Sequence, residues 1–298
     1  MSGTEFTQHI FNGIALGSLY ALIAIGYTMV YGILRLINFA HGEILMSAMF
    51  FAMFGVTLFS LPWPVAFLLA ILLTAAFGIS IERMAYRPLR NAPRISVLIS
   101  AIGVSFLLQN LGLVVFGARP KAFPRPDMFN QLWHLGDVSV LSLNLYIPIF
   151  TVLLLIGLTW FINKTRTGMA MRAASKDLDT ARLMGIDVDK IISITFGIGS
   201  ALAAFGGIMW AMKYPSIHPL VGLFPGLKCF IAAVVGGIGN VPGAMLGGFI
   251  LGVGEIMLVA FMPELSGYRD AFAFVLLIFI LLAKPTGILG EKTAEVKS

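Results

Sequence analysis

Long apolar runs, most of them close to 20 residues, constrain the fold of this chain more than any other feature. A helix rises about 1.5 Å per residue, so such a run spans the roughly 30 Å hydrocarbon core of a bilayer. The clear segments, the last extended by its flanking residues, are Ile10–Leu34, Asn38–Phe59, Pro64–Ile81, Ile95–Gly117, Leu145–Ile162, Ile191–Met212 and Ala271–Ala283. They predict an all-α, polytopic integral membrane protein.

Composition supports this class and excludes others. Of the 298 residues, 58% are hydrophobic and 11% are charged, whereas about 25% are charged in an average soluble domain. So few charges cannot cover a soluble fold, which excludes a cytosolic enzyme and a disordered chain. Cys229 is the sole cysteine, so an internal disulfide is excluded too.

The positions of Lys and Arg predict the orientation in the membrane. They gather after the third span at Arg83, Arg87, Arg90 and Arg94, in the loop 164–190, and after the last span. Short loops rich in Lys and Arg stay in the cytoplasm. We therefore expect one transmembrane domain over 1–298, with the N-terminus outside, an external loop at 117–144, and the loop 164–190 and the C-terminus in the cytoplasm. The net charge of +6 thus reflects topology and predicts no nucleic-acid partner.

A glycine-broken segment near the C-terminus complicates the count of crossings. After the sixth span, Ala244–Phe261 and Ala271–Ala283 alone would leave the C-terminus outside. A third apolar segment, Leu223–Val235, would restore the parity and bring the C-terminus back to the cytoplasm. It could be a short crossing, or it could re-enter the membrane and meet its partner at the glycine break. The sequence thus predicts eight or nine membrane segments, one of them broken by glycine.

The break itself reads Gly236-Gly-Ile-Gly-Asn-Val-Pro-Gly243. Glycines such as Gly237 and Gly239 favour a tight turn or an unwound helix, which must lie inside the protein or line a cavity at membrane depth. The Lys-Ser or Lys-Thr of a phosphate-binding loop does not follow it. We therefore expect no nucleotide site and no cofactor in this chain. The pairs Gly243/Gly247 and Gly248/Gly252 suit close helix packing.

Several polar side chains interrupt the apolar segments and are candidates for the transport pathway. Ionisable groups at membrane depth are costly unless they face a cavity or a partner. The candidates are Asn38, His41, Glu43, Gly237, Gly239 and Glu255. Structural roles stay open: Asn38 could cap a helix, Glu43 could complement the helix dipole, and Glu255 could bond a neighbouring helix. The four histidines show no ligand spacing, so we expect no metal site.

The loop 164–190 contains a short predicted helix. Ser175 suits its N-cap, Asp177 suits its first turn, and Gly185 suits its end. Small residues recur every fourth position on one face, which carries Ala173, Asp177, Ala181 and Gly185. A helix this short is unstable alone in water. It is therefore either docked in a groove of a partner or an ordinary loop helix.

At this point the sequence resembles a known family, the membrane-spanning permease subunits of bacterial ABC importers for branched-chain amino acids. The resemblance covers nearly the whole chain and keeps the order of the motifs. They are Gly17–Gly32, Ile37–Glu43, Ile81–Arg90, Arg172–Leu178, Ala181–Ile186, the glycine break and Lys284–Gly290. The Asn-Phe-Ala-His-Gly element alone is shared with urea and short-chain-amide permeases.

The resemblance implies a location and a set of partners. The location is the bacterial inner membrane. The partners are a homologous second permease, two cytoplasmic ATPase subunits that hydrolyse ATP, and a soluble substrate-binding protein outside. The helix Ala173–Gly185 then resembles a coupling helix that contacts the ATPase, with Arg172 beside it. The chain itself would not be an enzyme.

Alternative functions stay open. Within the family, the substrate could be urea or a short amide. A secondary transporter would use Glu43 or Glu255 to carry a proton, and a passive channel would use neither. The helix in the basic loop favours the ABC permease, because a channel or a carrier does not need it.

Overall fold

Helices form almost the whole molecule, which is described by a computed structural model over residues 3–90, 92–136 and 138–290. Seven helices of this part are long and apolar enough to cross a membrane, and two apolar helices are shorter. The helices are α1 Gly3–Leu34, α2 His41–Thr57, α3 Trp63–Ile81, α4 Arg94–Phe116, α5 Ser142–Lys164, α6 Arg166–Lys176, α7 Leu178–Leu183, α8 Val188–Lys213, α9 Leu223–Gly236, α10 Val241–Phe261 and α11 Arg269–Ala283. The predicted apolar segments are confirmed as helices, and the polytopic all-α class with them.

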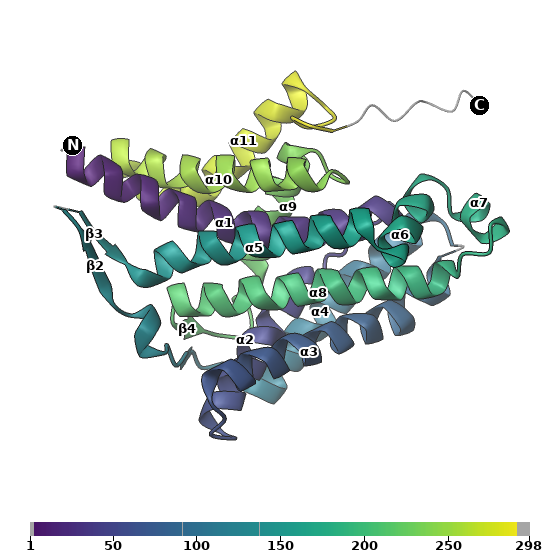
Figure 1. The fold of residues 1–298 in the computed structure, drawn as a ribbon, viewed down its shortest axis with the longest axis horizontal. Coiled ribbons are helices and arrows are strands. Elements are labelled where there is room, and N and C mark those ends of the chain that lie inside the picture. Colours follow the sequence, from purple (N-terminus) through teal and green to yellow (C-terminus); the bar gives the residue numbers. More distant parts are fainter. Residues whose placement is uncertain (1–2, 91, 137, 291–298) are drawn as a thin grey trace.

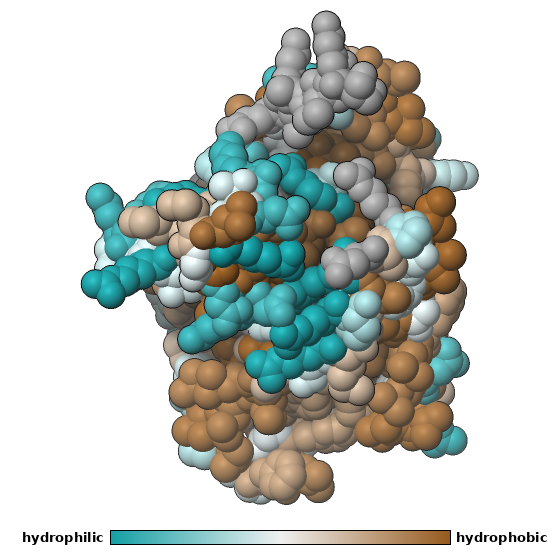
Figure 2. Space-filling model, turned by 90° about the vertical axis from the view of Figure 1, so that its right-hand side faces the viewer, coloured by the Kyte–Doolittle hydropathy of each residue, from teal (hydrophilic) through white to brown (hydrophobic). Residues whose placement is uncertain are grey.

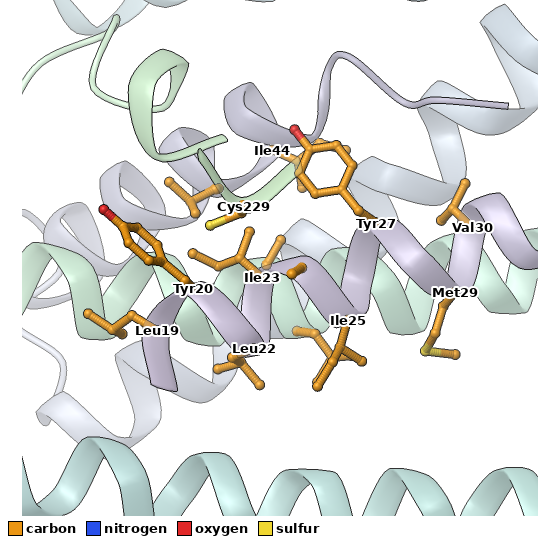
Figure 3. Close-up of a cluster of buried hydrophobic side chains, with 14 of the residues drawn as sticks. Leu19, Tyr20, Leu22, Ile23, Ile25, Tyr27, Met29, Val30, Ile44 and Cys229 are labelled. Carbon is orange, nitrogen blue, oxygen red and sulfur yellow. The ribbon is translucent and has the colours of Figure 1, made fainter. Parts of the chain in front are cut away.

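Helix α1 lies at the centre of the bundle (Figure 1). It is buried along nearly all of its apolar length and contacts α5, α8, α9 and α10. Figure 3 shows its side chains with Cys229 of α9 among them. The close packing against α10 depends on glycine, because a β-carbon on Gly248 would overlap the backbone of Ala21. The packing role predicted for the pair Gly248/Gly252 is confirmed, since a β-carbon on Gly252 would likewise overlap the backbone of Gly17.

The two ends of the bundle differ. At one end, a two-stranded hairpin of β2 (Leu132–Leu135) and β3 (Val138–Leu141) lies beside the start of α1, and β1 (Lys121–Ala122) pairs with β4 (Ser216–Ile217). We call this the hairpin end. At the other, the α7 end, lie α6, α7 and the last described residues (Figure 1). The strands were not predicted, since two- to four-residue strands leave little trace in sequence.

The short helices α2 and α9 begin inside the bundle and run in opposite directions. The segment after α1 turns back at Arg35, whose φ is +54°, and α2 then runs from His41 to the hairpin end. Helix α9 starts beside Gly42 and ends near the α7 end. Each short helix thus completes a crossing only together with the non-helical segment before it. This explains the parity problem, because Leu223–Gly236 forms the second half of a broken crossing.

The glycine break is a tight turn between α9 and α10 at the α7 end. Gly237 and Gly239 have φ values of +111° and +97°, which glycine adopts without strain. The N–H groups of Ile288 and Leu289 donate to the carbonyls of Val235 and Gly236, each at 2.9 Å. The segment after α11 therefore covers the first part of the break: Gly236 and Gly237 are buried, as expected, whereas Gly239 and Pro242 are exposed.

Candidate functional site

A cavity of about 290 Å³ lies where α2 and α9 meet; we call it the α2–α9 cavity. Its walls come from α1, α2, α4 and α9. Most of its lining is apolar or glycine, contributed by Phe39, Gly42, Ile102, Phe106, Gly222, Leu223, Gly226, Leu227 and Phe230, and the polar lining is Tyr27, Glu43, Ser105 and Gln109. Such a cavity suits a small molecule with one apolar and one polar part.

Glu43 is the only ionisable carboxylate among the lining residues, and it is 2% exposed. It lies in the first turn of α2, where the helix dipole favours a negative charge. Gln109 Nε2 donates to its Oε1 at 2.7 Å and to Ser105 Oγ at 3.2 Å. The second oxygen, Oε2, has no hydrogen-bond partner in the described part of the chain. An unpaired buried acceptor on a side chain that lines a cavity suggests a ligand.

His41 and Asn38 flank this carboxylate. The His41 ring packs on Tyr27 with ring centroids 4.2 Å apart, in space that a β-carbon on Gly26 would occupy. Asn38 Oδ1 accepts from Ala40 N–H at 3.1 Å and from the Tyr86 hydroxyl at 2.7 Å. The expectation that Asn38 caps α2 is wrong, since the N-cap is Ala40 and its side chain makes no cap.

Two more cavities continue from Asn38 toward the α7 end. The first, about 200 Å³, is lined by Asn38, Tyr86 and Arg35 among others. The second, about 370 Å³, shares Arg35 with it and reaches Asp177. These two cavities are thus adjacent, whereas the α2–α9 cavity shares no lining residue with them and adjoins the first only through the neighbouring residues Asn38 and Phe39.

Glu255 belongs to a different cluster. Lys228 Nζ lies 2.8 Å from its Oε1 and 2.7 Å from Asp270 Oδ1, and the Tyr20 hydroxyl donates to Oε2 at 3.1 Å. Bonding of Glu255 to neighbouring helices, one of the two roles considered for it, is what the structure shows. The cation Lys228 was missed, although a lysine inside the apolar run 223–235 was the available signal.

Neither Gly237 nor Gly239 lines the described cavities. Both lie at the turn covered by the segment after α11. Of the candidate pathway residues, Glu43 lines the α2–α9 cavity and Asn38 lines the neighbouring cavity of about 200 Å³. His41 packs on Tyr27 and lines none of the described cavities, and Glu255 and the two glycines lie elsewhere.

The loop 164–190 holds two short helices instead of the single predicted helix Ala173–Gly185. Ser175 lies inside α6, and the chain is extended at Asp177, with φ −157° and ψ 120°. Asp177 Oδ1 accepts from Thr180 N–H at 2.8 Å, a bond that holds the pKa of this carboxyl below its usual range. The expected Ser175 cap is wrong, because Asp177 bonds the backbone more favourably as the cap of α7. Gly185 ends α7 with φ +82°, as predicted.

The predicted small-residue face is exposed at Ala173, Asp177 and Gly185 and buried at Ala181. Ala181 is 3% exposed and packs against this chain, whereas Leu183 and Met184 are 88% and 78% exposed. Arg172 is held beside α5, because its guanidinium donates to the carbonyl of Ile162. Figure 2, a view of the α7 end, shows hydrophilic side chains gathered there, above a hydrophobic flank. The sequence pattern places Met184 beside the small-residue face, whereas Leu183 was missed and stands out only through its exposure.

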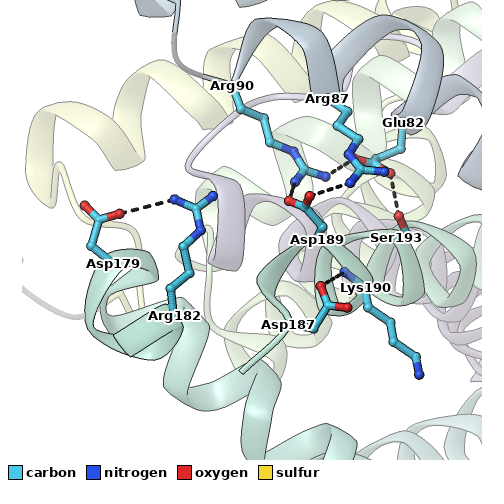
Figure 4. A network of polar contacts seen from close by, with 9 residues as sticks. All are labelled: Glu82, Arg87, Arg90, Asp179, Arg182, Asp187, Asp189, Lys190 and Ser193. Carbon is cyan, nitrogen blue, oxygen red and sulfur yellow. Dashed lines mark hydrogen bonds and ion pairs between the residues drawn. The ribbon is translucent and has the colours of Figure 1, made fainter. Parts of the chain in front are cut away.

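A charged network links the segment that follows α3 to helix α8, at the α7 end (Figure 4). Arg90 pairs with Glu82 and with Asp189, and Arg87 also pairs with Asp189. Ser193 Oγ donates to the other oxygen of the fully buried Glu82 at 2.7 Å. Arg87 and Arg90, which were assigned to the basic segment after the third span, thus have a structural role.

Comparisons with known proteins agree on one family. A family model described as branched-chain amino acid transport system / permease component matches residues 9–281. The high-affinity branched-chain amino acid transport system permease protein LivH of Escherichia coli K12 is 46% identical, with 97% of both chains covered. BraD of Pseudomonas aeruginosa, which bears the same description, is 45% identical over 98% of both chains. A solved structure, PsaBC from Streptococcus pneumoniae in complex with Fab, matches with a TM-score of 0.49 and 12% identity, covering 94% of this chain and 91% of the other.

Proposed function

This chain belongs to the branched-chain amino acid permease family, and from that membership we propose how its cavities and ends perform transport. The protein is a multi-pass permease subunit of the inner membrane that moves branched-chain amino acids in an ATP-driven importer. ATP hydrolysis takes place in partner ATPase subunits, and this chain itself acts as a pathway and carries neither a catalytic site nor a cofactor.

The observation that carries the proposal is the α2–α9 cavity. Its apolar walls suit the aliphatic side chain of leucine, isoleucine or valine, while Glu43 and Gln109 supply a polar side. Burial of an aliphatic side chain in such walls is favourable by about 25 cal/mol per Å² of apolar surface. The cavity is one station of the pathway, and the two cavities toward the α7 end continue it.

A homologous second permease completes the pathway. The α2–α9 cavity is bordered by exposed apolar side chains, among them Phe106, Leu223 and Leu227. If the pathway opened sideways into lipid, a charged substrate would be exposed to hydrocarbon, which is energetically costly. The second permease is therefore placed against α4 and α9, where it would close this opening.

The two ends of the bundle receive the other partners. The α7 end faces the cytoplasm, where α6 and α7 contact an ATPase subunit through the exposed Leu183 and Met184. Arg172, Ala173, Asp177, Ala181 and Gly185 belong to this coupling element; Ala181 packs against the rest of the chain and the other four are exposed. The hairpin end, with the loop 117–144 and the start of α1, lies outside and receives the substrate-binding protein.

Uptake by the reconstituted complex tests this function. The four membrane-associated subunits are placed in liposomes with internal ATP and supplied with loaded binding protein outside. We expect accumulation of labelled leucine that depends on ATP and persists when an uncoupler removes the proton gradient. Accumulation that an uncoupler abolishes would overturn the ABC assignment in favour of a proton-coupled carrier. Uptake of urea or acetamide in preference to leucine would overturn the substrate class.

A further inference from the structure

One oxygen of Glu43 lacks a partner in a place where an unpaired charge is costly. The residue is 2% exposed, and Oε2 makes no hydrogen bond within the described residues. A buried carboxylate without a counterion is strongly unfavourable. A cationic donor on Oε2 would remove that cost.

The surroundings keep a place for that donor. Gln109 bonds only Oε1, so Oε2 is the unpaired oxygen of a side chain that lines the α2–α9 cavity. The cation on α9, Lys228, is bonded to Glu255 and Asp270 and is not among the lining residues. The helix dipole at the start of α2 offsets part of the cost of a buried negative charge there.

The other lining residues indicate which chemical group is attached to the cation. Around the carboxylate the walls are apolar, with Phe39, Phe106, Leu227 and Phe230 among them. A compact ammonium group bound to an aliphatic chain would satisfy both features, because its N–H groups would bond Oε2 and its side chain would cover the apolar wall.

We propose that Glu43 Oε2 binds the α-ammonium group of the amino acid during its passage through the α2–α9 cavity. The proposal rests on the function given above and adds the recognition chemistry: the permease itself selects for the amine, independently of the binding protein. Gln109 positions the carboxylate by holding Oε1. An aliphatic acid without the amine would meet an unpaired carboxylate and be rejected.

Protection of a cysteine in the cavity tests this without transport. Ser105 lines the cavity, and the native Cys229 is buried, so Ser105→Cys in the purified complex provides a site for alkylation by a maleimide. Leucine and 3-methylbutylamine, which has the amine but no carboxylate, should slow alkylation severalfold. The acid 4-methylpentanoate, which has the same carbon skeleton without the amine, should not. Equal protection by the acid, or no protection by either amine, would overturn the proposal.

Glu43→Gln supplies the second arm. Glutamine keeps the size of the side chain and its bond to Gln109, so a purely structural role predicts unchanged uptake and unchanged protection. We expect instead at least a tenfold loss of leucine uptake and loss of protection by both amines, with ATPase stimulation by loaded binding protein retained. The control Ser47→Ala removes a hydroxyl that donates to the Glu43 carbonyl at 2.8 Å and should leave uptake unchanged.

The experiments distinguish a failure of the proposed function from a failure of the ammonium site. If the wild-type complex does not accumulate leucine with ATP, the proposed function is wrong. If it does, and Glu43→Gln transports and is protected as the wild type is, only the ammonium site is wrong.

Discussion

Gly42 of α2 and Gly222, the N-cap of α9, meet backbone to backbone, and a β-carbon on either would overlap the other's carbonyl. This contact lets the first turns of two oppositely directed half-crossings approach each other inside the bundle. It also forms part of the wall of the α2–α9 cavity. The pair therefore controls both the folding of the two short helices and the shape of the pathway.

Replacing Gly42 by alanine should destabilise the protein. Alanine in a helix is normally better than glycine by about 1 kcal/mol, but here the added methyl group would overlap Gly222, and overpacking costs roughly 1–3 kcal/mol. We expect a lower melting temperature of the purified complex and reduced leucine uptake. Gly157→Ala is the matched control, because nothing lies within 4 Å of a β-carbon there, and it should be neutral or stabilising. Equal behaviour of the two variants would contradict the close contact.

Apolar length located the membrane segments in the sequence but not the starting points of α2 and α9. Asn38–Phe59 and Leu223–Val235 read as apolar runs whether the chain crosses fully or begins half-way. The decisive information is the contact between Gly42 and Gly222, which joins residues far apart in sequence. Two glycines carry no sign of which partner they meet.

The Lys228–Glu255 pair should behave as a buried ion pair. Glu255 is fully buried and Lys228 is 9% exposed, so Lys228→Met leaves a buried carboxylate with reduced compensation. Breaking such a pair costs about 3–5 kcal/mol. The double variant Lys228→Met/Glu255→Gln should recover a large part of that loss. Thermal unfolding of the wild type, the single variants Lys228→Met and Glu255→Gln, and the double variant in one detergent gives the coupling free energy. Additive effects would show that the pair does not interact.

Arg90 and Arg87 offer a graded comparison at the α7 end. Arg90 has a side chain 10% exposed and pairs with the buried Glu82, whereas the side chain of Arg87 is 47% exposed and pairs with Asp189. Arg90→Met should cost about 3–5 kcal/mol, as for a buried pair, and Arg87→Met about 0–1 kcal/mol. The measurement is again thermal unfolding. A larger effect at Arg87 would mean that Glu82 has another counterion.

Charge patterns in the sequence predicted the orientation of this basic segment but not its internal role. Arg87 and Arg90 were counted for topology alone, because their acidic partner Asp189 lies about a hundred positions away. Asp177 shows the same limit at short range. Its neighbours suggested one helix, and only the geometry reveals that its side chain starts a new one.

Cysteine labelling checks the orientation. Asp127 and Leu183 are both exposed and lie at the hairpin end and the α7 end respectively, while the native Cys229 is buried. In intact spheroplasts, an impermeant maleimide should label Asp127→Cys rapidly, and Leu183→Cys only after the membrane is opened. The reverse order of labelling would invert the topology and exchange the two sets of partners.

The last prediction concerns how α7 contacts the ATPase. Leu183 and Met184 are large apolar side chains on an otherwise polar end of the molecule, and apolar anchors of this kind contribute much of the affinity at protein interfaces. Leu183→Asp should weaken retention of the ATPase subunits during purification at least tenfold and reduce uptake, while the permease still inserts in the membrane. Asp179→Asn is the matched control on the same helix: its side chain is 91% exposed and pairs with Arg182 at 3.3 Å, a surface interaction worth about 0–1 kcal/mol. It should retain both ATPase and uptake. If Leu183→Asp keeps the ATPase as firmly as Asp179→Asn does, the exposed apolar end of α7 is not the coupling contact, and the ATPase must bind elsewhere on the α7 end.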